Sequence, residues 1–478
     1  MDSSSGFLVL IIYGLVAFGL TFWYSRGYGE DKTSFLLARR ELNTVQGSFS
    51  IAAAWLWAPG LFISAQQAYV NGLAGLFWFC LGNFLTLGAF AYFAKQLREK
   101  EPDGFTFSGY LKHKYSGRVQ SLFVVEMMLL AICAFAINLL AGSRTVDALT
   151  GMDEGLVRLM MVAVAILYSF RSGLKATVVT EMLKIVIVWT GVLVLVPWVI
   201  VNAGGWDVVI AGMTGIKNPS WVSVFLGFGA AAFLGHMGGP WGDNSFYQRA
   251  FSIKKESIIP SFVIASFVFI VIPIMMGLLG FVAAGSGMQI DNVGVTNAMV
   301  IAEFLPDGAS LFFMFMVFAG LVAILDSQFS SVANMTGHDI YNQFKRGGKP
   351  LVKDITRRQP DNRANFWARG GMISLAVVGL LVSHIPGIQI LHLFLFFAVL
   401  RASVWIPSMI SFLKPDLISE KGMFWGILVG ATVGEILFVS GKLGYTDTAF
   451  LGTMIAVFGT PLLAIGISKN PDWIGYEK

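Results

Sequence analysis

The chain has 478 residues, of which 56% are hydrophobic and only 13% are charged, and its mean hydropathy is +0.71. Soluble domains carry roughly 25% charged residues, so this composition excludes a soluble enzyme or binding module and predicts a multi-pass membrane protein. The formal net charge of +5 does not indicate a nucleic-acid partner, because the basic residues fall mainly in the loops between apolar runs. Cys80 and Cys133 lie inside apolar runs, where we expect packing rather than a disulfide or a metal site.

Apolar runs of roughly 18 residues or more are long enough to cross a bilayer, and the sequence contains thirteen of them. We expect the first to be a true span and not a cleaved signal peptide, because neither a basic region nor a cleavage site accompanies it. The predicted spans are residues 7–25, 45–68, 71–95, 119–142, 155–170, 174–201, 220–237, 257–284, 308–340, 366–384, 388–412, 423–441 and 449–467.

The distribution of Lys and Arg predicts the orientation, because these residues gather on the cytoplasmic side of membrane proteins. An odd number of spans places the termini on opposite sides. With the N-terminus outside, the outer loops and helix ends contain only Arg144, Arg158, Lys217 and Lys442. We therefore predict an outside N-terminus, a cytoplasmic C-terminus and residence in the plasma (cell inner) membrane.

The stretch from Ser50 to Gly60 is apolar but contains a proline, Pro59, next to Gly60. Proline lacks an amide hydrogen and clashes with the preceding turn, so we predict two half-helices with an unwound joint. Freed backbone groups are costly in hydrocarbon, and such a break persists where it lines a protected cavity. A binding site beside Trp55 and Trp57 is therefore predicted, the alternative being a proline kink that only shapes packing.

A second interruption occurs in residues 235–243, Gly-His-Met-Gly-Gly-Pro-Trp-Gly-Asp. Paired interruptions in corresponding halves indicate an inverted repeat that holds solute and ions near the bilayer midplane. This interruption lies near the inner end of its span, so the start of a loop is the alternative. The predicted fold is all-α, one membrane domain over residues 1–478, with repeats 45–201 and 220–412, an additional helix 7–25 and two peripheral helices within 423–467.

Six ionisable side chains fall at membrane depth, where charges are costly and mark a pathway or an ion pair. They are Glu126, Glu181, Lys184, Asp326, Arg401 and Glu435. Glu181 and Lys184 are three residues apart and share a helix face, and Asp326 lies at a comparable depth. The lysine ammonium among these carboxylates either holds the place of a bound monovalent cation or titrates, and a fixed salt-bridge cluster is the alternative.

Arg401 and Glu435 lie at matching depths in consecutive spans, as counted at roughly 1.5 Å per residue. We therefore predict a buried ion pair between them. If Arg401 instead faces the cavity, its guanidinium suits a carboxylate substrate.

Several motifs resemble the sodium:solute symporter family in content and order, over about Ser34 to Ile465. They are Phe35-Leu-Leu-Ala-Arg-Arg-Glu-Leu, Gly173-Leu-Lys-Ala-Thr with Thr180-Glu181, and Leu325-Asp326-Ser327-Gln328 followed by Asp339-Ile340-Tyr341. Four more resemble its urea permease branch, namely Trp55-Leu-Trp57-Ala58, Tyr69-Val-Asn-Gly72, Gly75-Leu-Phe-Trp78 and Lys100-Glu-Pro-Asp-Gly-Phe-Thr106-Phe. The resemblance implies a thirteen-helix transporter with a five-plus-five, LeuT-type core that works by alternating access.

The resemblance also implies a sodium site made by the backbone carbonyls of Ala53 and Leu56 and by two consecutive hydroxyl residues. In this sequence Ala323 and Ile324 occupy the hydroxyl positions, and neither side chain has an oxygen with which to bind sodium.

Two further positions depart from the family pattern, with Glu181 in place of the usual aspartate and Lys184 in place of the usual glutamine. Hard cations need oxygen ligands, so we predict that the sodium site is dismantled and that Lys184 substitutes for the ion, with Glu181 or Asp326 as partner. The alternative is a displaced sodium site built from Ser327, Ser330 and Ser331.

For the solute, the resemblance places a cavity between the break in the second span and spans 3, 7 and 11. The candidate contacts are Trp55, Trp57, Gln66, Trp78, His236, Trp241 and Asp243. Indole faces with a few amide and carboxylate groups suit a small, flat, polar solute such as urea, and simple packing is the alternative for each aromatic residue.

The leading hypothesis is a secondary transporter of a urea-like solute that is proton-coupled or facilitative, with no cofactor and no metal. One alternative is a sodium-coupled symporter of an amino acid or small carboxylate. Another is a transporter-like sensor that acts through a partner protein. We do not expect an enzyme, because the five histidines are scattered and no nucleophile–base pair is evident.

Overall fold

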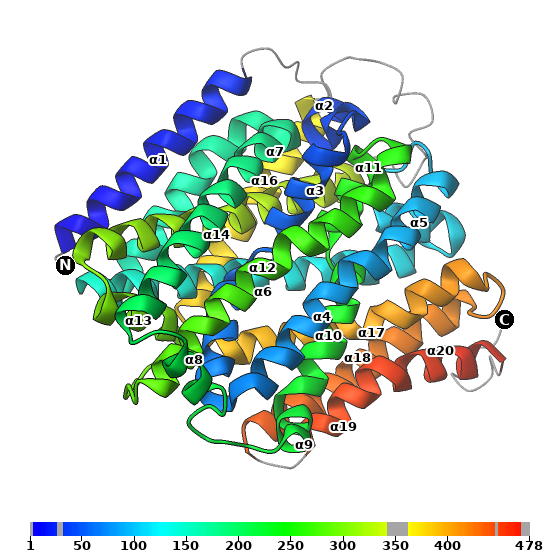
Figure 1. Ribbon diagram of the computed structural model, residues 1–478. Coiled ribbons are helices and arrows are strands. Elements are labelled where there is room, and N and C mark those ends of the chain that lie inside the picture. Colours follow the sequence, from blue (N-terminus) through cyan, green and yellow to red (C-terminus); the bar gives the residue numbers. More distant parts are fainter. Residues whose placement is uncertain (1–2, 26–31, 342–361, 445–447, 470–478) are drawn as a thin grey trace.

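The chain folds into a bundle of long helices, shown in Figure 1 as a computed structural model that describes residues 3–25, 32–341, 362–444 and 448–469. All the regular secondary structure of these residues is helical. The α-helices are α1 (Ser3–Ser25), α2 (Lys32–Leu37), α3 (Thr44–Trp55), α4 (Ser64–Lys100), α5 (Phe107–Lys114), α6 (Gly117–Thr150), α7 (Glu154–Asn202), α8 (Trp206–Gly212), α9 (Trp221–Val224), α10 (Ala230–Gly242), α11 (Asn244–Ser252), α12 (Ile258–Gly285), α13 (Thr296–Phe304), α14 (Asp307–Asn334), α16 (Asn362–Ser383), α17 (Ile390–Leu413), α18 (Glu420–Lys442), α19 (Ala449–Met454) and α20 (Thr460–Lys469). Four π-helical turns adjoin them, at Pro59–Ile63, Phe225–Gly229, Met335–Ile340 and Ile455–Gly459.

Ten helical segments of the described chain are long and apolar enough to cross a membrane, which confirms the multi-pass prediction. They are Pro59–Lys100, Gly117–Thr150, Thr180–Asn202, Trp221–Gly242, Lys255–Gly285, Asp307–Ile340, Arg363–Ser383, Ile390–Leu413, Glu420–Lys442 and Ala449–Lys469. The predicted spans 7–25, 45–68 and 155–170 have no separate counterpart in this set.

Gly72 explains one of these differences. It lies inside α4 with φ +62° and ψ −149°, so the helix is interrupted there. A Cβ atom at this position would lie 2.2 Å from the carbonyl oxygen of Met213, and the Leu73 amide donates to that same oxygen at 2.7 Å. The close approach and the positive φ both require glycine, so the segment Pro59–Lys100 contains the end of one predicted span and the whole of the next.

The long helix α7 is not straight along its whole length. Ser169 and Lys184 both bond the carboxylate of Asp326 on α14. In a straight helix, residues this far apart would be separated by roughly 22 Å at 1.5 Å per residue. Helix α7 is therefore not straight between these two residues.

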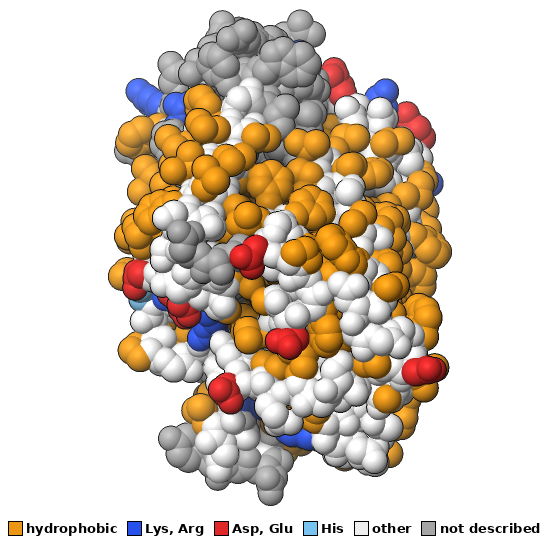
Figure 2. Space-filling model, turned by 60° about the vertical axis from the view of Figure 1, so that its left-hand side comes forward, with side chains coloured by type: hydrophobic (Ala, Val, Ile, Leu, Met, Phe, Trp, Pro, Cys, Tyr) orange, Lys and Arg blue, Asp and Glu red, His pale blue; other side chains and the backbone are white. Residues whose placement is uncertain are grey.

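The short helices gather at two ends of the bundle (Figure 1). We call them the α11 end, where α2, α5 and α11 lie, and the α9 end, where α8, α9 and α13 lie. Helix α1 packs on α7 and α14 at one margin, whereas α18 packs on α17 and α20 at the opposite margin. Figure 2 shows hydrophobic side chains over a broad band of one face, as expected for a surface in contact with lipid.

Candidate functional site

The predicted joint in the second span is present near the centre of the bundle. Helix α3 ends at Trp55, and Leu56 has φ −82° and ψ +82°, outside the helical region. The joint comprises Leu56 and Trp57 and so lies just before Pro59, not at it. Pro59 instead begins the second half-helix, where its missing amide hydrogen costs no hydrogen bond.

Side chains from other helices satisfy the backbone groups that the joint frees. The Ala58 amide donates to Asn138 Oδ1 of α6 at 2.9 Å, and the Leu61 carbonyl accepts from Asn297 Nδ2 of α13 at 3.0 Å. Two asparagines therefore hold the broken helix open. Neither was predicted, because an asparagine in an apolar run gives no sign of which distant backbone it serves.

The second interruption lies at the last residue of the predicted stretch. Helix α10 continues through Pro240 to Gly242, and Asp243, with φ −116° and ψ 112°, separates it from α11. The Asp243 carboxylate accepts from the Ser245 amide at 2.8 Å and thereby caps α11. The joint between α10 and α11 is therefore a helix boundary with a capping residue.

The glycines of α10 serve close packing instead of breaking the helix. A Cβ atom at Gly235 would lie 2.3 Å from the Cβ of Ala398, and one at Gly238 would lie 2.7 Å from the Cα of Ala402. Both partners are on α17, so small residues allow the two backbones to approach directly.

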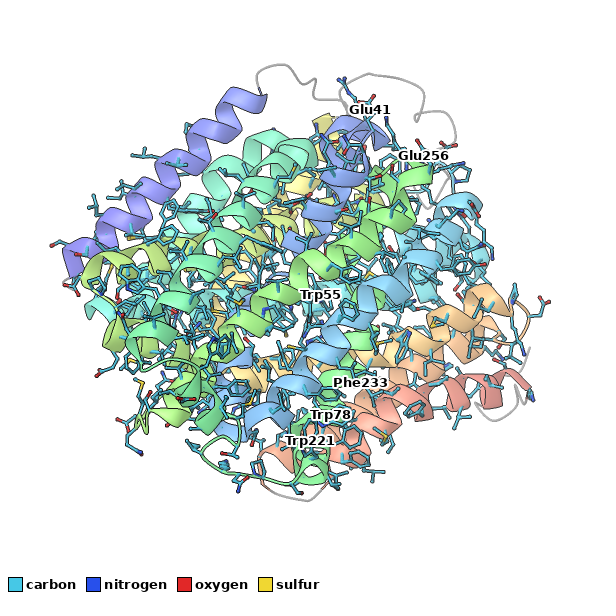
Figure 3. The ribbon with its side chains drawn as sticks, viewed as in Figure 1. Glu41, Trp55, Trp78, Trp221, Phe233 and Glu256 are labelled. Atoms are coloured by element: carbon cyan, nitrogen blue, oxygen red, sulfur yellow. The ribbon has the colours of Figure 1, made fainter. Side chains whose placement is uncertain are left out.

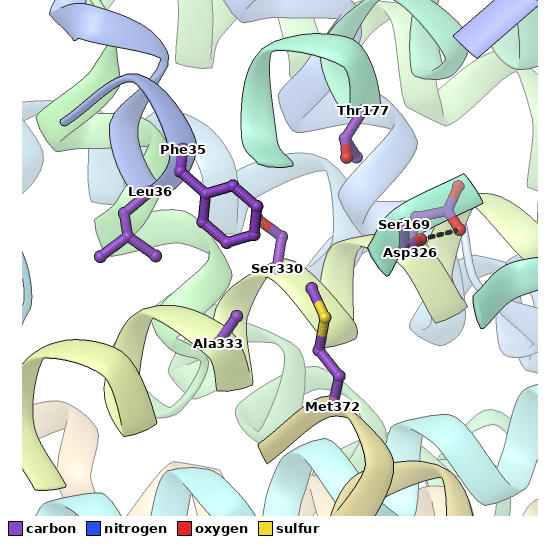
Figure 4. Close-up of a pocket in the computed structure, with 8 residues that line it drawn as sticks. All are labelled: Phe35, Leu36, Ser169, Thr177, Asp326, Ser330, Ala333 and Met372. Atoms are coloured by element: carbon purple, nitrogen blue, oxygen red, sulfur yellow. Dashed lines mark hydrogen bonds between the residues drawn. The ribbon is translucent and has the colours of Figure 1, made fainter. Parts of the chain in front are cut away.

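Lys184 and Asp326 form a buried ion pair between α7 and α14. Asp326 is one of the two carboxylates that we predicted as partners of Lys184. Ser169 donates a further hydrogen bond to Asp326 Oδ1 at 3.1 Å. Asp326 also borders a crevice that has essentially no room for a water molecule. Figure 4 shows this crevice, lined by Phe35, Leu36, Ser169, Thr177, Asp326, Ser330, Ala333 and Met372.

The other predicted partner, Glu181, is bound by Arg249 of α11. Arg249 Nη2 lies 2.5 Å from Glu181 Oε1 and donates to Ser327 Oγ at 2.9 Å, and its Nε donates to Ser50 Oγ at 3.0 Å. Ser50 and Ser327 in turn donate to Glu181 at 2.5 and 2.6 Å. This fully buried network ties α3, α7, α11 and α14 together at the α11 end.

The side chains at the predicted sodium positions are arranged as follows. Ala323 and Ile324 are buried and apolar, and the Ala53 carbonyl accepts from the Leu56 amide at 3.2 Å. Of the serines in the alternative site, Ser327 joins the Arg249 network and Ser330 bonds Gln248 Nε2 at 3.1 Å. The hydroxyl of Ser331 has no hydrogen-bond partner.

Arg401 of α17 lies beside the joint among the rings of Phe397, Trp57 and Trp55, a packed set of side chains that we call the aromatic chamber. Its Cζ atom is 4.5 Å from the ring centre of Phe397, 5.2 Å from Trp57 and 5.4 Å from Trp55. The side chain is 1% exposed, and its Nε and Nη2 atoms have no hydrogen-bond partner. Aromatic faces attract a cation but accept few of its hydrogen bonds, so the guanidinium keeps donor capacity for a ligand.

The predicted ion pair between Arg401 and Glu435 is not formed in this structure. Both carboxyl oxygens of Glu435 lack a hydrogen-bond partner, whereas Arg401 is directed towards α3. Matching depths placed the two residues at one level, but the rotation of α17 about its axis turns the guanidinium away from α18.

His236 adjoins the aromatic chamber, with its ring centre 6.1 Å from that of Trp55. Its Nε2 atom lies 3.0 Å from Nδ2 of Asn83 on α4. The Oδ1 atom of Asn83 is buried and has no hydrogen-bond partner. The chamber region therefore offers free donors on Arg401 and a free acceptor on Asn83.

The seven predicted solute contacts do not form a single site. Figure 3 shows Trp55 near the centre, whereas Trp78 lies towards the α9 end with Trp221 and Phe233. The ring centre of Trp78 is 4.8 Å from that of Phe225, so Trp78 packs at the end of the bundle. The sequence separation between Trp57 and Trp78 does not show that the helix is interrupted at Gly72. Because of this interruption, Trp78 lies at the α9 end and not beside Trp57.

Of the remaining three predicted contacts, Trp241 and Asp243 lie at the end of α10 and Gln66 lies at the α9 end. Trp241 is buried against Phe90, with ring centres 4.9 Å apart. Asp243 accepts from Gln328 Nε2 at 3.1 Å as well as capping α11. Gln66 lines an open cavity of about 500 Å³ at the α9 end.

We call this cavity the vestibule. Its polar lining residues are Gln66, Gln67, Asn71, Lys217, Ser223 and Lys442. No carboxylate is among its lining residues, so two lysines give it a positive potential. Leu395 of α17 also lines it, and Phe397 lies between this level and Arg401 along the same helix.

The sequence is similar to those of known membrane transporters. Residues 35–430 match the model of the sodium:solute symporter family. The chain is 24% identical over 360 residues to a probable urea active transporter of Schizosaccharomyces pombe, covering 68% of this chain and 54% of that protein. It is 21% identical to a urea-proton symporter of Oryza sativa subsp. japonica, covering 93% and 68%. It is 23% identical to an osmoregulated proline transporter of Bacillus subtilis, covering 98% and 96%.

Solved structures support the same fold. A substrate-bound, outward-open Na⁺-coupled sialic acid symporter superposes with a TM-score of 0.78 at 13% identity, covering 97% of this chain and 98% of that one. The nucleobase-cation-symport transporter Mhp1 superposes with a TM-score of 0.57 at 14% identity, covering 88% and 92%. The chain spans about half the length of the first urea transporter named above. From the family match and the fold, the chain belongs to the sodium:solute symporter family, a family of membrane transporters and not of enzymes.

Proposed function

We propose that this transporter moves a small polar solute, represented by urea, by alternating access without using sodium. Relatives that carry urea in their names support the solute class. A helix joint with two indoles beside it supports a central binding site. Proton coupling and facilitated diffusion are the two modes that remain once sodium is set aside.

The proposed architecture has thirteen spans, with residues 45–201 and 220–412 as inverted five-helix repeats. The marginal positions of α1 and α18 support their assignment outside the repeats. The distribution of basic residues supports an outside N-terminus and a cytoplasmic C-terminus in the plasma membrane. In this orientation the α11 end is cytoplasmic and the vestibule opens to the outside.

The contact of Lys184 with Asp326 is the observation that carries the sodium-independence proposal. An ammonium supplies the positive charge that a bound monovalent cation would otherwise bring to this carboxylate. The neighbouring turn of α14 offers Ala323 and Ile324 where sodium needs oxygen ligands. The built-in cation therefore makes the pair independent of external sodium.

The two buried ion pairs also explain how one face of the transporter is closed. Lys184–Asp326 and Arg249–Glu181 join helices α7, α11 and α14 at the cytoplasmic end. At the opposite end the vestibule is open. We infer that this conformation receives solute from outside and that opening inward separates helices that these pairs hold together.

Urea fits the chemistry of the aromatic chamber. Its planar faces pack against Trp55 and Trp57, and its carbonyl oxygen accepts from the free donors of Arg401. Its amide groups donate to the free Oδ1 of Asn83. Each of these protein atoms lacks a partner in the structure, so solute binding satisfies groups that are otherwise costly to bury.

A small carboxylate is the second candidate solute, because Arg401 is buried, forms no salt bridge with the described residues and has two nitrogen atoms, Nε and Nη2, without a hydrogen-bond partner. Asp243 acts on it only electrostatically. The lysines of the vestibule, Lys217 and Lys442, would attract an anion towards it. The two candidates differ in charge, so transport of an anion moves charge across the membrane and transport of urea alone does not.

Uptake of labelled urea into proteoliposomes tests the proposal, with sodium and proton gradients imposed separately. We expect uptake that is unchanged by sodium. A response to the proton gradient identifies symport, and its absence identifies facilitation. Sodium-driven uptake would refute the role of Lys184. A lack of urea uptake, together with inhibition or electrogenic uptake by small carboxylates, would select the second solute, and binding without transport would select a sensor.

The role of Lys184 has its own test. The triple variant Lys184→Gln, Ala323→Ser, Ile324→Thr removes the built-in cation and adds two hydroxyl ligands, so we expect sodium to stimulate its uptake. The double variant Ala323→Ser, Ile324→Thr is the matched control and should remain independent of sodium, because Lys184 still occupies the carboxylate. A folded, active triple variant without any sodium effect would count against the cation surrogate.

A further inference from the structure

Two buried carboxyl groups on α6 and α18 have no partner that balances them. Glu126 is 5% exposed and Glu435 is 8% exposed. None of their four carboxyl oxygens has a hydrogen-bond partner, and the ion pairs of the described chain include neither residue. They therefore differ from Glu181 and Asp326, which are bound by cations at the α11 end.

The two carboxyl groups lie around the same part of α17. Helices α6 and α18 pack against α17 and against each other. The two carboxyl groups are close enough to act on one another electrostatically, and Glu435 lies at the backbone of Leu400 on α17. Leu130, one turn beyond Glu126, would contact a Cβ atom at Gly242, as would the Cβ of Arg401. Glu126 and Glu435 thus flank the helix that carries Arg401, while its guanidinium faces the aromatic chamber.

Such a pair cannot carry two uncompensated negative charges in a low-dielectric environment. A proton or a metal cation must neutralise at least one of them. No hydroxyl or side-chain amide is bonded to either carboxyl, and the backbone of Leu400 acts on Glu435 as a donor, so a metal cation would lack most of the oxygen ligands that it needs. A proton needs only the carboxyl group itself.

We propose that Glu126 and Glu435 form the proton-binding site of this transporter and that the proton bound there is the coupling proton. The coupling part of this proposal rests on the proposed transport function. Glu435 belongs to α18, outside the proposed repeats, whereas Glu126 belongs to α6, inside the first. Movement of the repeats against α18 changes the separation of the carboxyl groups, and with it their joint affinity for a proton.

The pair is surrounded by few other titratable or charged groups. These are Cys133 on the same face of α6, Tyr247 of α11, Asp243 at the α10–α11 joint, and Arg401 of α17. Tyr247 donates to the Trp241 carbonyl at 2.9 Å, and Asp243 is bonded to Gln328. Because Tyr247 and Asp243 are bonded to other groups, neither side chain forms a hydrogen bond that would stabilise the carboxyl pair in place of a bound proton.

Infrared difference spectroscopy on the purified protein in lipid tests proton binding without any solute. Protonated carboxyl groups give a carbonyl stretching band that disappears when they ionise. We expect this band to titrate in the wild type, to change in Glu126→Gln and in Glu435→Gln, and to be lost in the double variant. Glu420→Gln, an exposed glutamate in the first turn of α18, is the matched control and should leave the band unchanged.

Two outcomes of this experiment would overturn the proposal. A band that persists in the double variant assigns the protonated carboxyl elsewhere. A band that vanishes when sodium or potassium chloride is added at constant pH identifies a metal-cation site instead. Glutamine has the size of glutamate and carries no charge, so these variants should fold, and Glu435→Asp, which retains a carboxyl group, should retain a titrating band.

The coupling step is tested by labelled urea uptake into proteoliposomes with an imposed proton gradient. We expect the gradient to accelerate uptake by the wild type and by Glu420→Gln, and this acceleration to be lost in Glu435→Gln while urea exchange remains measurable. Acceleration that persists in Glu435→Gln would overturn the coupling role. If the wild type does not transport urea, the proposed solute fails, and the infrared result still decides whether the carboxyl pair binds a proton.

Discussion

The contribution of the buried Lys184–Asp326 ion pair to the free energy of unfolding can be tested quantitatively. The side chains are only 4% and 0% exposed. Removing one partner of a buried ion pair leaves an uncompensated charge and costs about 3–5 kcal/mol. We therefore expect Lys184→Met to lower the free energy of unfolding by about that amount. Adding Asp326→Asn should recover most of the loss, because it removes the stranded charge and keeps an acceptor for the Ser169 hydroxyl.

The assay is reversible unfolding of the purified protein in mixed detergent–lipid micelles, followed by tryptophan fluorescence. Lys95→Met provides the matched control, because Lys95 lies 3.9 Å from Glu99 with side chains that are 41% and 46% exposed. Exposed pairs contribute only about 0.2–1 kcal/mol. The reasoning is refuted if Lys184→Met costs no more than Lys95→Met, or if the double variant is as unstable as Lys184→Met alone.

Two further predictions concern packing and pH. A Cβ atom at Gly239 would lie 2.2 Å from the ring of Trp55, whereas one at Gly227 would meet nothing within 4 Å. Gly239→Ala should therefore destabilise the protein by about 1–3 kcal/mol and weaken urea uptake. Gly227→Ala is the control, and an equal effect of the two substitutions would contradict this prediction. The Glu101 carboxylate, 3.5 Å from His113, raises the pKa of that histidine. The stabilisation of the fold by this pair is present below the ordinary pKa of histidine and is lost as the pH rises through the raised pKa of His113. His113→Gln should therefore lower the melting temperature at about pH 5 but not at about pH 8. An equal effect at both pH values would exclude this pair as the cause.

The sequence alone was sufficient for the fold class, the family and the helix joint, and it narrowed the partner of Lys184 to Glu181 or Asp326, of which the structure pairs it with Asp326. Each of these follows from hydropathy, from residue order or from depth along a span. Depth does not specify how far a helix is rotated about its axis. Arg401 and Glu435 lie, as predicted, on helices long and apolar enough to cross a membrane, but for this reason they were wrongly paired. Trp78 was assigned to a site from which the interruption at Gly72 separates it.

Arg249 shows a second limit of prediction from sequence. A basic residue just beyond an apolar span is expected in a cytoplasmic loop, where it sets the orientation. Here the cap at Asp243 starts the short helix α11, which turns inward and buries Arg249 against Glu181. The capped joint allows this change of direction, and nothing in the hydropathy of residues 244–252 indicates that α11 packs against the bundle and does not extend into solvent.

The six ionisable side chains predicted at membrane depth, together with Arg249, fall into two groups with different consequences. Lys184 and Arg249 are paired with carboxylates, so they stabilise the packing of α7, α11 and α14 at the α11 end. Arg401 and the two glutamates around α17 are unpaired and lower stability unless a ligand neutralises them. A solute that binds Arg401 and a proton that binds Glu126 or Glu435 each act on α17 from opposite sides. If both favour the same position of α17, the solute strengthens binding of the proton by the same factor by which the proton strengthens binding of the solute. This reciprocal coupling is the thermodynamic condition for symport.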